Sequence, residues 1–400
     1  MSKRKIINDP VYGFLTIDDD TLYDVIEHRY FQRLRNIMQL GCTYYVYPGA
    51  THNRFGHALG ALNLMGRALE VLRVKGVEIT PDEALGAKLA ILLHDVGHGP
   101  FSHTLEKALV DESHEVITSL FMQRMNKDFH GKLDTAIRIF HDTYPKHFLH
   151  QLVSSQLDMD RLDYLSRDSF FSGVSEGVVG TERIINMLNV HEDELVVDVK
   201  GVYSVEKFIL SRRLMYWQVY LHKTVVAADM MLQNIVLRAK ECIAHGERLG
   251  GPETLAYFLR GGEADIERFA LLDDSDVMVA IKTWMQSSSD KTLRTLCEMF
   301  IHRKLPAVAI SDVPFQDEFL AQRRRNAANR LGIGEEESKY FVGTGVHENH
   351  AYDFHDPEIR ILYKDGTCKD ISEASDQLDR HFLEKTVRKY YAYFIKDTTA

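Results

Sequence analysis

Histidine and aspartate side chains that could bind a metal ion occur at spaced positions in the N-terminal half of the chain. His57 is followed by the adjacent pair His94-Asp95, and Asp160 comes later. Imidazole nitrogen and carboxylate oxygen together suit borderline divalent ions, whereas an all-oxygen set favours Mg or Ca. The four side chains therefore predict a site for a divalent metal ion (Mn, Fe, Zn, Ni or Mg), with positions left open for water and a phosphate group.

The stretch 92–103 strengthens this prediction, because it places three histidines and an aspartate directly after an apolar segment. A lone histidine or aspartate is more often a satisfied polar group than a ligand, but ordinary core packing does not require such a cluster. Neighbouring side chains on a helix diverge by about 100°. His94 and Asp95 can therefore share an ion only near a helix end, and Gly97 and Gly99 predict that end.

Helices are expected to carry most of these residues. Apolar residues recur at steps of three and four over 57–74, which predicts a helix with one buried face. The segment 80–83 combines a capping threonine, a first-turn proline and a glutamate, so a second helix should begin there and run into His94. Further helices are expected at 115–125, 149–165, 205–243 and 373–394.

Strands are expected to be few and short. Residues 194–204 alternate in polarity and predict a hairpin that turns at Gly201, and residues 359–369 predict another that turns at Gly366. The expected fold class is mainly α, with a helical core, minor β-hairpins and a mixed α/β C-terminal lobe.

The length suggests more than one structural unit. The chain has 400 residues, which can bury a large core. We expect one domain over 1–310, with its catalytic core at about 30–230, and a C-terminal lobe over 311–400 to which the sequence assigns no role.

Composition excludes several classes of protein. No apolar run approaches the roughly 20 residues that a membrane span requires, and no apolar signal segment follows the N-terminus, so we expect a cytoplasmic protein without a membrane role. The net charge of -10 argues against nucleic acid as a partner, because such binding depends on clustered Lys and Arg. The four scattered cysteines suit a reducing compartment.

The order His57, His94-Asp95, Asp160 resembles the metal signature of the HD-domain family. The resemblance is closer to one branch, the deoxynucleoside triphosphate (dNTP) triphosphohydrolases. The matching phrases lie at 5–13, 31–35, 39–41, 44–57, 94–103 and 158–168. Six ordered matches are far more specific than a His-Asp dipeptide, although they end before Lys223. The resemblance implies hydrolysis of a dNTP, dGTP among them, to the deoxynucleoside and tripolyphosphate, with metal-bound water attacking the α-phosphorus.

Three histidines near the predicted metal ligands resemble the catalytic histidines of this branch. They are His98, His103 and His114. The resemblance implies that one orients the α-phosphate and that others transfer protons, a task that suits imidazole because it titrates near neutral pH. A purely structural role is the alternative for each.

The resemblance also implies a phosphate clamp and a sugar pocket. Residues that resemble the clamp are Arg54, Arg161, Tyr164 and Arg212, and those that resemble the sugar contacts are Gln39, Leu40, Asp168 and Tyr220. Relatives often have Lys in place of Arg161, and the bidentate guanidinium should grip phosphate differently. In the sugar pocket an aromatic ring crowds the 2′ position, although Leu40 and Tyr220 would also suit core packing.

Some members of this branch are activated by nucleotides that bridge subunits. Residues that match this effector region are Lys5, Asn8, Glu27, Gln32 and Arg35. Glu27 stands where the base-reading relative has Asp, which could change or abolish the choice of effector. The resemblance thus implies a nucleotide effector and a homo-oligomer, either a dimer or a tetramer. A looser second match comprises Val46, Tyr47, His222 and Lys223.

Two other functions stay open at this point. The chain could be another HD enzyme, a nucleotidase or phosphodiesterase, although Arg161, Tyr164 and Asp168 favour a triphosphate substrate. It could instead be a nucleotide-sensing or binding protein with a vestigial site, against which the intact set of ligand residues counts. A separate basic run at 323–330 fits a solvated helix face, or an anion or subunit contact.

Overall fold

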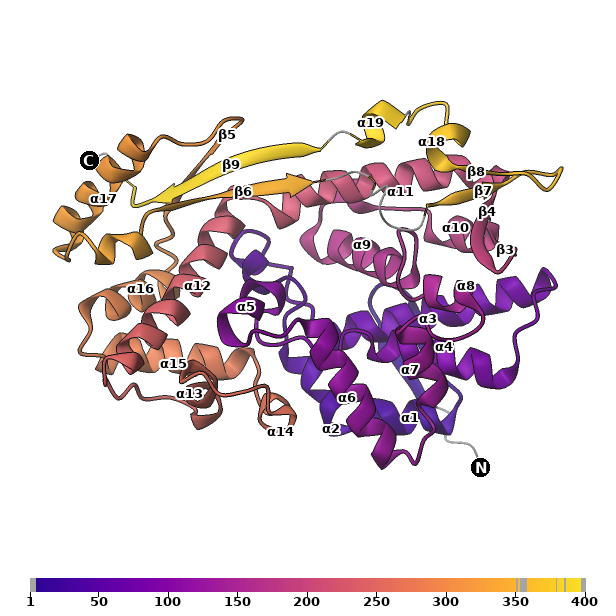
Figure 1. Cartoon of the computed structure of the whole chain (residues 1–400), viewed down its shortest axis with the longest axis horizontal. Coiled ribbons are helices and arrows are strands. Elements are labelled where there is room, and N and C mark those ends of the chain that lie inside the picture. Colours follow the sequence, from indigo (N-terminus) through magenta and orange to yellow (C-terminus); the bar gives the residue numbers. More distant parts are fainter. Residues whose placement is uncertain (1–4, 350–351, 353–357, 379, 385, 397–400) are drawn as a thin grey trace.

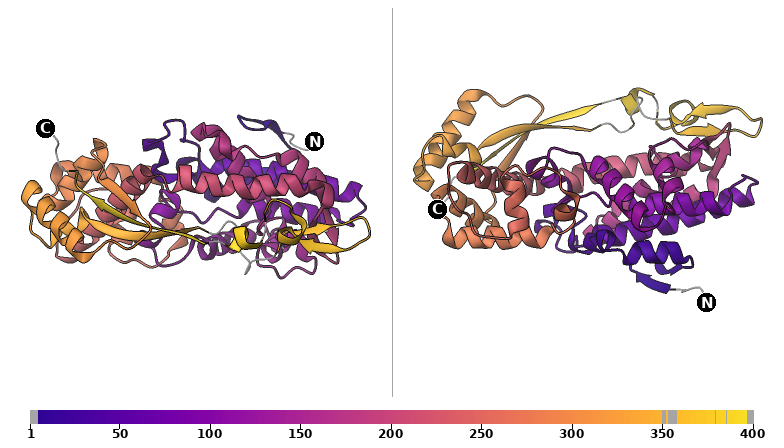
Figure 2. Two further views of the ribbon diagram at one scale, coloured as in Figure 1. Left: turned by 90° about the horizontal axis from the view of Figure 1, so that it is seen from above. Right: turned by 60° about the horizontal axis from the view of Figure 1, so that its bottom comes forward.

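The protein, seen here as a computed structural model, is described for residues 5–349, 352, 358–378, 380–384 and 386–396. It is elongated and mainly helical, with a layer of short strands along one long side (Figure 1). Figure 2 places the N-terminal hairpin and the C-terminal strands on opposite sides of the helices. The predicted fold class is therefore confirmed. The division at residue 310 stays a prediction.

Two helices with nearly continuous apolar surface form the centre of the molecule. Helix α3 (Arg54–Val74) packs against α4 (Pro81–Leu93) and α9 (Met159–Ser172). Both expected helices are confirmed, including the start of α4, where Thr80 and Glu83 form a reciprocal capping box. Because α3 and α4 bury most of their length, they hold His57 and His94 rigidly.

The expected helix over 149–165 is wrong in its middle. The structure has α8 (His147–Gln151), then a turn, then α9. The carboxylate of Asp158 accepts the N–H groups of Ser155 and Arg161, so it caps a new helix where periodicity alone predicts continuity. This break brings Asp160 into the first turn of α9.

The expected helix over 205–243 is also two helices. α11 (Val202–Met215) passes through a π-helical turn (Tyr216–Tyr220) and stops, and α12 (Lys223–Ala244) begins again. The imidazole of His222 accepts the N–H of Thr224 and caps α12, although no Gly or Pro marks the break in the sequence.

The hairpin predicted over 194–204 is wrong in its turn. β4 (Glu194–Asp198) pairs with the preceding β3 (Leu188–His191), and residues 199–201 instead start α11. The other predicted hairpin is confirmed, with β7 (Arg360–Leu362) antiparallel to β8 (Cys368–Asp370). β7 also runs parallel to β4, which joins the two hairpins into one sheet.

The expected helix over 373–394 is wrong. The segment contains the short helices α18 (Ile371–Ala374) and α19 (Arg380–Glu384) and then β9 (Val387–Phe394). β9 is the central strand between β5 (Ala307–Ser311) and β6 (Gly343–Asn349), and β5 lies against α12. Pairing on both edges outweighs the helical preference of the sequence.

The other elements complete the helical body and the N-terminal edge. The strands β1 (Lys5–Asp9) and β2 (Gly13–Ile17) form a separate hairpin. The remaining α-helices are α1 (Asp20–Glu27), α2 (Arg29–Gln32), α5 (Glu106–Leu109), α6 (His114–Asp128), α7 (Asp134–Phe140), α10 (Thr181–Met187), α13 (Glu253–Leu259), α14 (Ile266–Phe269), α15 (Asp274–Ser287), α16 (Lys291–Ile301) and α17 (Asp317–Leu331).

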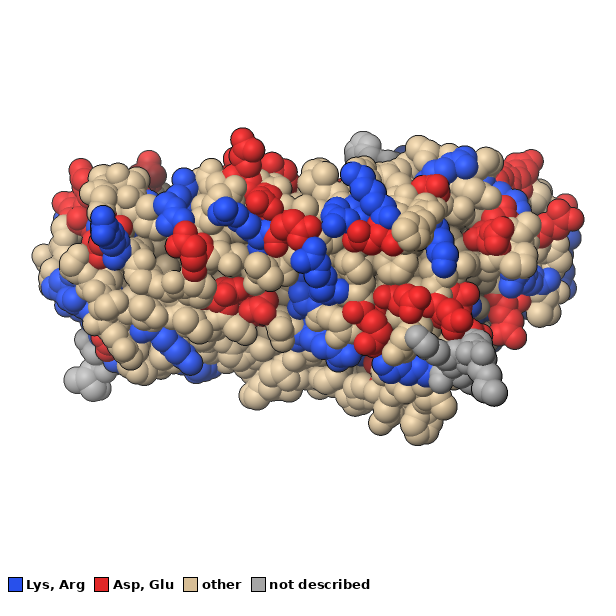
Figure 3. Space-filling view, turned by 90° about the horizontal axis from the view of Figure 1, so that it is seen from below, with Lys and Arg blue, Asp and Glu red and all other residues tan. Residues whose placement is uncertain are grey.

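Charged side chains are spread over one face of the molecule (Figure 3). On the face shown in Figure 3, acidic and basic side chains are interspersed rather than gathered into one patch. Within the described part of the chain, none of the helices is both long enough and apolar enough to cross a membrane.

Candidate active site

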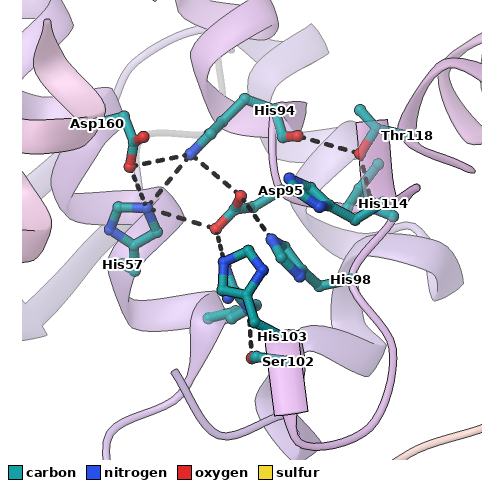
Figure 4. Close-up of polar contacts among 12 residues, drawn as sticks. His57, His94, Asp95, His98, Ser102, His103, His114, Thr118 and Asp160 are labelled. Atoms are coloured by element: carbon teal, nitrogen blue, oxygen red, sulfur yellow. Dashed lines mark hydrogen bonds and ion pairs between the residues drawn. The ribbon is translucent and has the colours of Figure 1, made fainter. Parts of the chain in front are cut away.

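Three of the four predicted metal ligands converge on one point between α3, α4 and α9. Nε2 of His57 lies 3.0 Å from Oδ1 of Asp160, and Nε2 of His94 lies 3.4 Å from the same oxygen. The two imidazole nitrogens are 3.3 Å apart. Figure 4 shows these side chains turned toward one another, and their ligand atoms are close enough to hold one ion.

Asp95 completes the cluster from the loop after α4. Its Oδ2 lies 3.5 Å from Nε2 of His57 and its Oδ1 lies 3.5 Å from Nε2 of His94. Two ligand atoms that each lie about 2.1 Å from an ion, at angles of about 90 to 110°, are about 3.0 to 3.5 Å apart. The observed separations of His57, His94 and Asp160 therefore fit a single divalent ion, and Asp95 lies within 3.5 Å of both imidazoles.

The charges of the cluster favour a cation. Burial lowers the pKa of His57, but Asp160 and Asp163 outweigh burial and raise this pKa to about 10. Burial raises the pKa of Asp95, yet Arg54, His94 and other neighbours hold it well below its usual range. A metal ion at this point would take the place of the proton on His57.

Each metal-facing imidazole is oriented by a partner on its other nitrogen. Nδ1 of His57 lies 2.7 Å from Oδ2 of Asp163, and Nδ1 of His94 lies 2.6 Å from the carbonyl oxygen of Ile91. Such partners fix the tautomer in which Nε2 is free to bind metal. Sequence reasoning missed Asp163, although its place one helical turn after Asp160 was a usable signal.

The three predicted catalytic histidines lie together beside the metal cluster. The rings of His98 and His114 stack at 3.9 Å, and His103 lies edge-on at 4.8 Å from His98. Nδ1 of His103 and Nδ1 of His114 lie 3.0 and 2.7 Å from the carboxylate of Glu106. Sequence reasoning missed Glu106, which can stabilise a positive charge on either ring.

The pKa values of His98 and Glu106 are both lowered, which leaves the imidazole neutral and the carboxylate ionised. Burial and the Arg54 guanidinium lower the pKa of His98 well below its usual value, so this imidazole is neutral at pH 7. Burial raises the pKa of Glu106, but His103 and His114 outweigh burial and lower it. The arrangement thus places one neutral imidazole and one ionised carboxylate on the same side of the metal cluster.

Arg54, which was predicted for the phosphate clamp, contacts Asp95 of the proposed metal cluster and Ser102, next to His103 of the histidine cluster. Its Nη1 contacts Oδ2 of Asp95, and its Nε donates a 2.7 Å hydrogen bond to Oγ of Ser102. The side chain is 4% exposed, so it forms part of the wall of the site rather than the surface.

A cavity of about 530 Å³ opens beside the metal cluster. This volume lies within the usual range for small-molecule sites. Predicted site residues that line the cavity are Gln39, Leu40, Arg54, Asp95, His98, His103, His114, Asp160, Tyr164, Asp168 and Tyr220. Lining residues that sequence reasoning did not select include Thr43, Thr104, Tyr216 and Asp229.

Asp168 holds two other side chains in place at the cavity. Its carboxylate accepts a 2.7 Å hydrogen bond from the hydroxyl of Tyr220, and its other oxygen lies 2.7 Å from Nε2 of His52. The Tyr220 ring lies edge-on to that of Tyr164, with centroids 6.5 Å apart. Leu40 and Tyr220 thus face a cavity, in contrast to the alternative of core packing.

Two predicted clamp residues lie outside the lining of the cavity. Nε of Arg161 lies 3.4 Å from Oδ2 of Asp158. Burial raises the pKa of Tyr164, and the charges of Arg212 and Arg161 oppose this rise.

The predicted effector residues lie around the N-terminal hairpin. Nζ of Lys5 lies 2.8 Å from Oε1 of Glu27, and Nε of Arg35 donates to Oε1 of Gln32. Asn8 lies on β1 opposite Phe14.

In the looser second region, the rings of Tyr47 and His222 are 6.1 Å apart. In the basic run, the Arg323 guanidinium packs on the Phe394 ring.

Comparison with known proteins agrees with this geometry. Residues 54–168 match the model of the HD domain, and residues 179–248 match that of the HD-associated region. The chain is similar to a crystal structure of a phosphohydrolase from Bacteroides thetaiotaomicron, with 48% identity, a TM-score of 0.95, and coverage of 98% of this chain and 100% of that one.

Curated relatives extend the comparison. The uncharacterised protein YwfO of Bacillus subtilis is 31% identical over 94% of this chain and 88% of its own length. The deoxynucleoside triphosphate triphosphohydrolase SAMHD1 homologue of Dictyostelium discoideum is 30% identical over 62% of this chain, which spans about half (52%) of that relative. The chain therefore belongs to the HD-domain phosphohydrolase family, with relatives among the dNTP triphosphohydrolases.

Proposed function

We propose that the chain is a metal-dependent dNTP triphosphohydrolase that converts a dNTP and water to the deoxynucleoside and tripolyphosphate. One observation carries the proposal. The cluster of His57, His94, Asp95 and Asp160 adjoins a cavity that is also lined by the hydrogen-bonded pair Asp168 and Tyr220. A nucleotide can therefore reach the metal with its phosphates while its sugar meets a polar and aromatic wall.

The reaction replaces the bond from the α-phosphorus to the 5′ oxygen by a bond to the oxygen of water. A bound divalent ion would acidify water and polarise the phosphate. The chain's own cationic group at this point is Arg54, whose guanidinium can neutralise charge on the phosphate. Because phosphoryl transfer depends mainly on positioning and charge, these groups account for most of the expected acceleration.

The leaving 5′ oxygen needs a proton, and the histidine cluster can supply it. The Glu106 carboxylate lies 3.0 Å from Nδ1 of His103 and 2.7 Å from Nδ1 of His114, so it orients both imidazoles. His98 is neutral and lies 3.3 Å from Oδ1 of Asp95. We assign proton donation to His103 or His114, and orientation of the α-phosphate to His98.

The sugar wall and the N-terminal surface extend the proposal. Gln39, Leu40, Asp168 and Tyr220 would contact the deoxyribose, and the Tyr220 ring would exclude a 2′ hydroxyl. Arg161, Tyr164 and Arg212 would bind the outer phosphates. Residues proposed for an effector nucleotide at a subunit contact of a homo-oligomer are Lys5, Asn8, Glu27, Gln32 and Arg35.

Product analysis tests the reaction. Purified protein loaded with Mn²⁺ is incubated with each of the four dNTPs, and the products are separated by anion-exchange chromatography. Tripolyphosphate and deoxynucleoside in equal amounts are expected. Orthophosphate or pyrophosphate without tripolyphosphate would refute the assignment. Turnover of nucleoside monophosphates or cyclic nucleotides in its place would instead indicate a nucleotidase or a phosphodiesterase.

A further inference from the structure

A continuous line of buried charged side chains joins the N-terminal hairpin to the metal ligand His57. At the end of β1, Oδ2 of Asp9 lies 2.9 Å from Nη1 of Arg167. The same guanidinium donates to both oxygens of Asp163, at 2.9 and 3.1 Å. Oδ2 of Asp163 then lies 2.7 Å from Nδ1 of His57. Three interactions therefore link the hairpin to the imidazole of His57, whose Nε2 faces Asp160.

The line is buried along its whole length. The exposed fractions are 5% for Asp9, 1% for Arg167, and 0% for Asp163 and His57. Charges are rarely buried to this degree unless each one is paired and hydrogen-bonded. Because solvent is excluded, no water is in place to replace an interaction that a displaced member would lose.

The surrounding backbone is adapted to this line. Oδ1 of Asp9 accepts the N–H groups of Val11 and Tyr12, which fixes the turn of the hairpin. On α3, Gly60 leaves the space that the line occupies, because a Cβ there would lie 1.9 Å from Oδ1 of Asp163 and 2.2 Å from Nη2 of Arg167. Both α3 and the hairpin are thus shaped around the two α9 side chains.

Asp9, Arg167 and Asp163 together carry one excess negative charge. The imidazole of His57, or a cation on its other nitrogen, balances this charge. A carboxylate that accepts the Nδ1–H fixes the ring orientation and makes Nε2 a stronger metal ligand. Arg167 pairs with Asp9 as well as with Asp163, so its positive charge is shared between two carboxylates. More of the negative charge of Asp163 is therefore available to His57.

We propose that Asp163 and Arg167 are positioning residues through which the N-terminal hairpin, by way of Asp9, sets the affinity of the site for its divalent ion. The hairpin is therefore a control element for the metal centre, and any ligand or contact that shifts it changes metal retention. This inference rests on the metal-binding part of the proposed function and does not depend on the substrate.

The competing explanation is that the line only fastens the hairpin to α9. In that case, loss of a member lowers the stability of the protein but leaves metal affinity unchanged in the folded molecules. The two explanations therefore differ in metal affinity measured well below the melting temperature.

The experiment compares Asp9→Asn, Asp163→Asn and Arg167→Lys with the natural protein. Mn²⁺ affinity is measured by competition with a chelator, and the melting temperature of the metal-free protein is measured separately. Phe14→Ser is the matched control, because Phe14 lies on the same hairpin, is 78% exposed and takes no part in the line. Asp9→Asn and Arg167→Lys keep the test decisive if Asp163→Asn fails to fold.

Asp9→Asn should weaken Mn²⁺ binding by about 10-fold, at the lower end of the effect of losing a partner of a metal ligand. Asp163→Asn should weaken it further, and the effects of the two variants should not add, since they act through one line. Phe14→Ser should leave affinity unchanged. The proposal is overturned if Asp9→Asn and Arg167→Lys bind Mn²⁺ within twofold of the natural protein. Because no nucleotide is used, failure to release tripolyphosphate would not affect this result.

Discussion

The hydroxyl of Tyr220 donates a 2.7 Å hydrogen bond to Oδ2 of Asp168. Asp168 is 1% exposed, and its second oxygen is engaged by His52, whose ring stacks on Phe171 at 4.6 Å. The Tyr220 hydroxyl is thus held by a buried carboxylate whose two oxygens are both engaged. A fixed ring at the cavity wall can reject a substrate by shape.

Replacement of Tyr220 separates the roles of its ring and its hydroxyl. Tyr220→Ala should raise the ratio of kcat/KM for GTP to that for dGTP by about 10-fold or more, because space opens where a 2′ hydroxyl would lie. Tyr220→Phe retains the ring and should largely keep the discrimination. An unchanged ratio in Tyr220→Ala would contradict the assignment of this wall to the sugar.

Removal of one proposed metal ligand should abolish both metal binding and turnover. His94→Ala deletes one of two imidazoles in the cluster, and we expect a loss of bound metal together with a fall in kcat of about 1000-fold or more. His302→Ala is the control, since the side chain of His302 is 52% exposed and lies outside the cavity lining. Metal analysis by mass spectrometry and steady-state kinetics check the outcome. Normal turnover in His94→Ala would disprove metal binding by this cluster.

Asp274 should make stability depend on pH. Its carboxylate accepts the N–H groups of Met38 and Phe101, at 2.9 and 2.6 Å, and thereby ties two loops of the cavity to the start of α15. Burial raises the pKa of Asp274 to about 7, although these two hydrogen bonds oppose the rise. The folded state therefore holds this proton more tightly than the unfolded state does.

Because the folded state holds this proton more tightly, the protein loses stability as the pH rises. The stabilisation by protonated Asp274 is complete below about pH 4, where the unfolded chain is also protonated, and is lost as pH rises to about 7. The free energy of unfolding of the natural protein, relative to Asp274→Asn, should fall by on the order of 4 kcal/mol over this range. Melting of both proteins at several pH values measures it. A constant difference between them would rule out a raised pKa.

Gly97 and Gly66 form a matched pair for testing how closely the segment after α4 packs against α6. A Cβ at Gly97 would lie 2.2 Å from the carbonyl oxygen of His114 and 2.3 Å from the N–H nitrogen of Thr118. Gly97→Ala must therefore push α6 away, and we expect a loss of about 3 kcal/mol in the free energy of unfolding. A lower melting temperature and weaker activity are the measured results.

Gly66→Ala serves as the comparison, because the nearest atom to its added Cβ is Cε of Lys88 at 3.6 Å. Gly66 lies inside α3, where alanine should stabilise the helix by about 0.5 to 1 kcal/mol. If both variants lose stability equally, backbone contact at Gly97 is not the cause.

Local signals in the sequence predicted the elements that carry the metal ligands. The apolar periodicity of α3 and the capping box at Thr80 depend only on neighbouring residues, so both helices were placed within a few residues of their observed ends. The end of α4 at Leu93 also follows from nearby glycines. These elements place His57 and His94, whose imidazoles lie close to Asp160 in the structure.

Features that depend on distant partners were not predictable from one sequence. The Asp163 carboxylate acts on a histidine 106 residues earlier in the chain, and His52 lies 116 residues before Asp168. The break before α12 has no Gly or Pro to mark it, because His222 caps the new helix with its side chain. β9 becomes a strand only through pairing with β5 and β6 on its two edges.

The position of β9 also governs the order of assembly during synthesis. β5 precedes β9 by 76 residues, counted from 311 to 387, and within the described residues both β5 and β6 use β9 as their shared partner. On a ribosome the HD helices can pack as soon as they emerge, while these two strands keep open edges until residue 394 has left the tunnel. Chaperones that cover exposed strand edges should therefore engage the nascent chain late, after the metal cluster is already built.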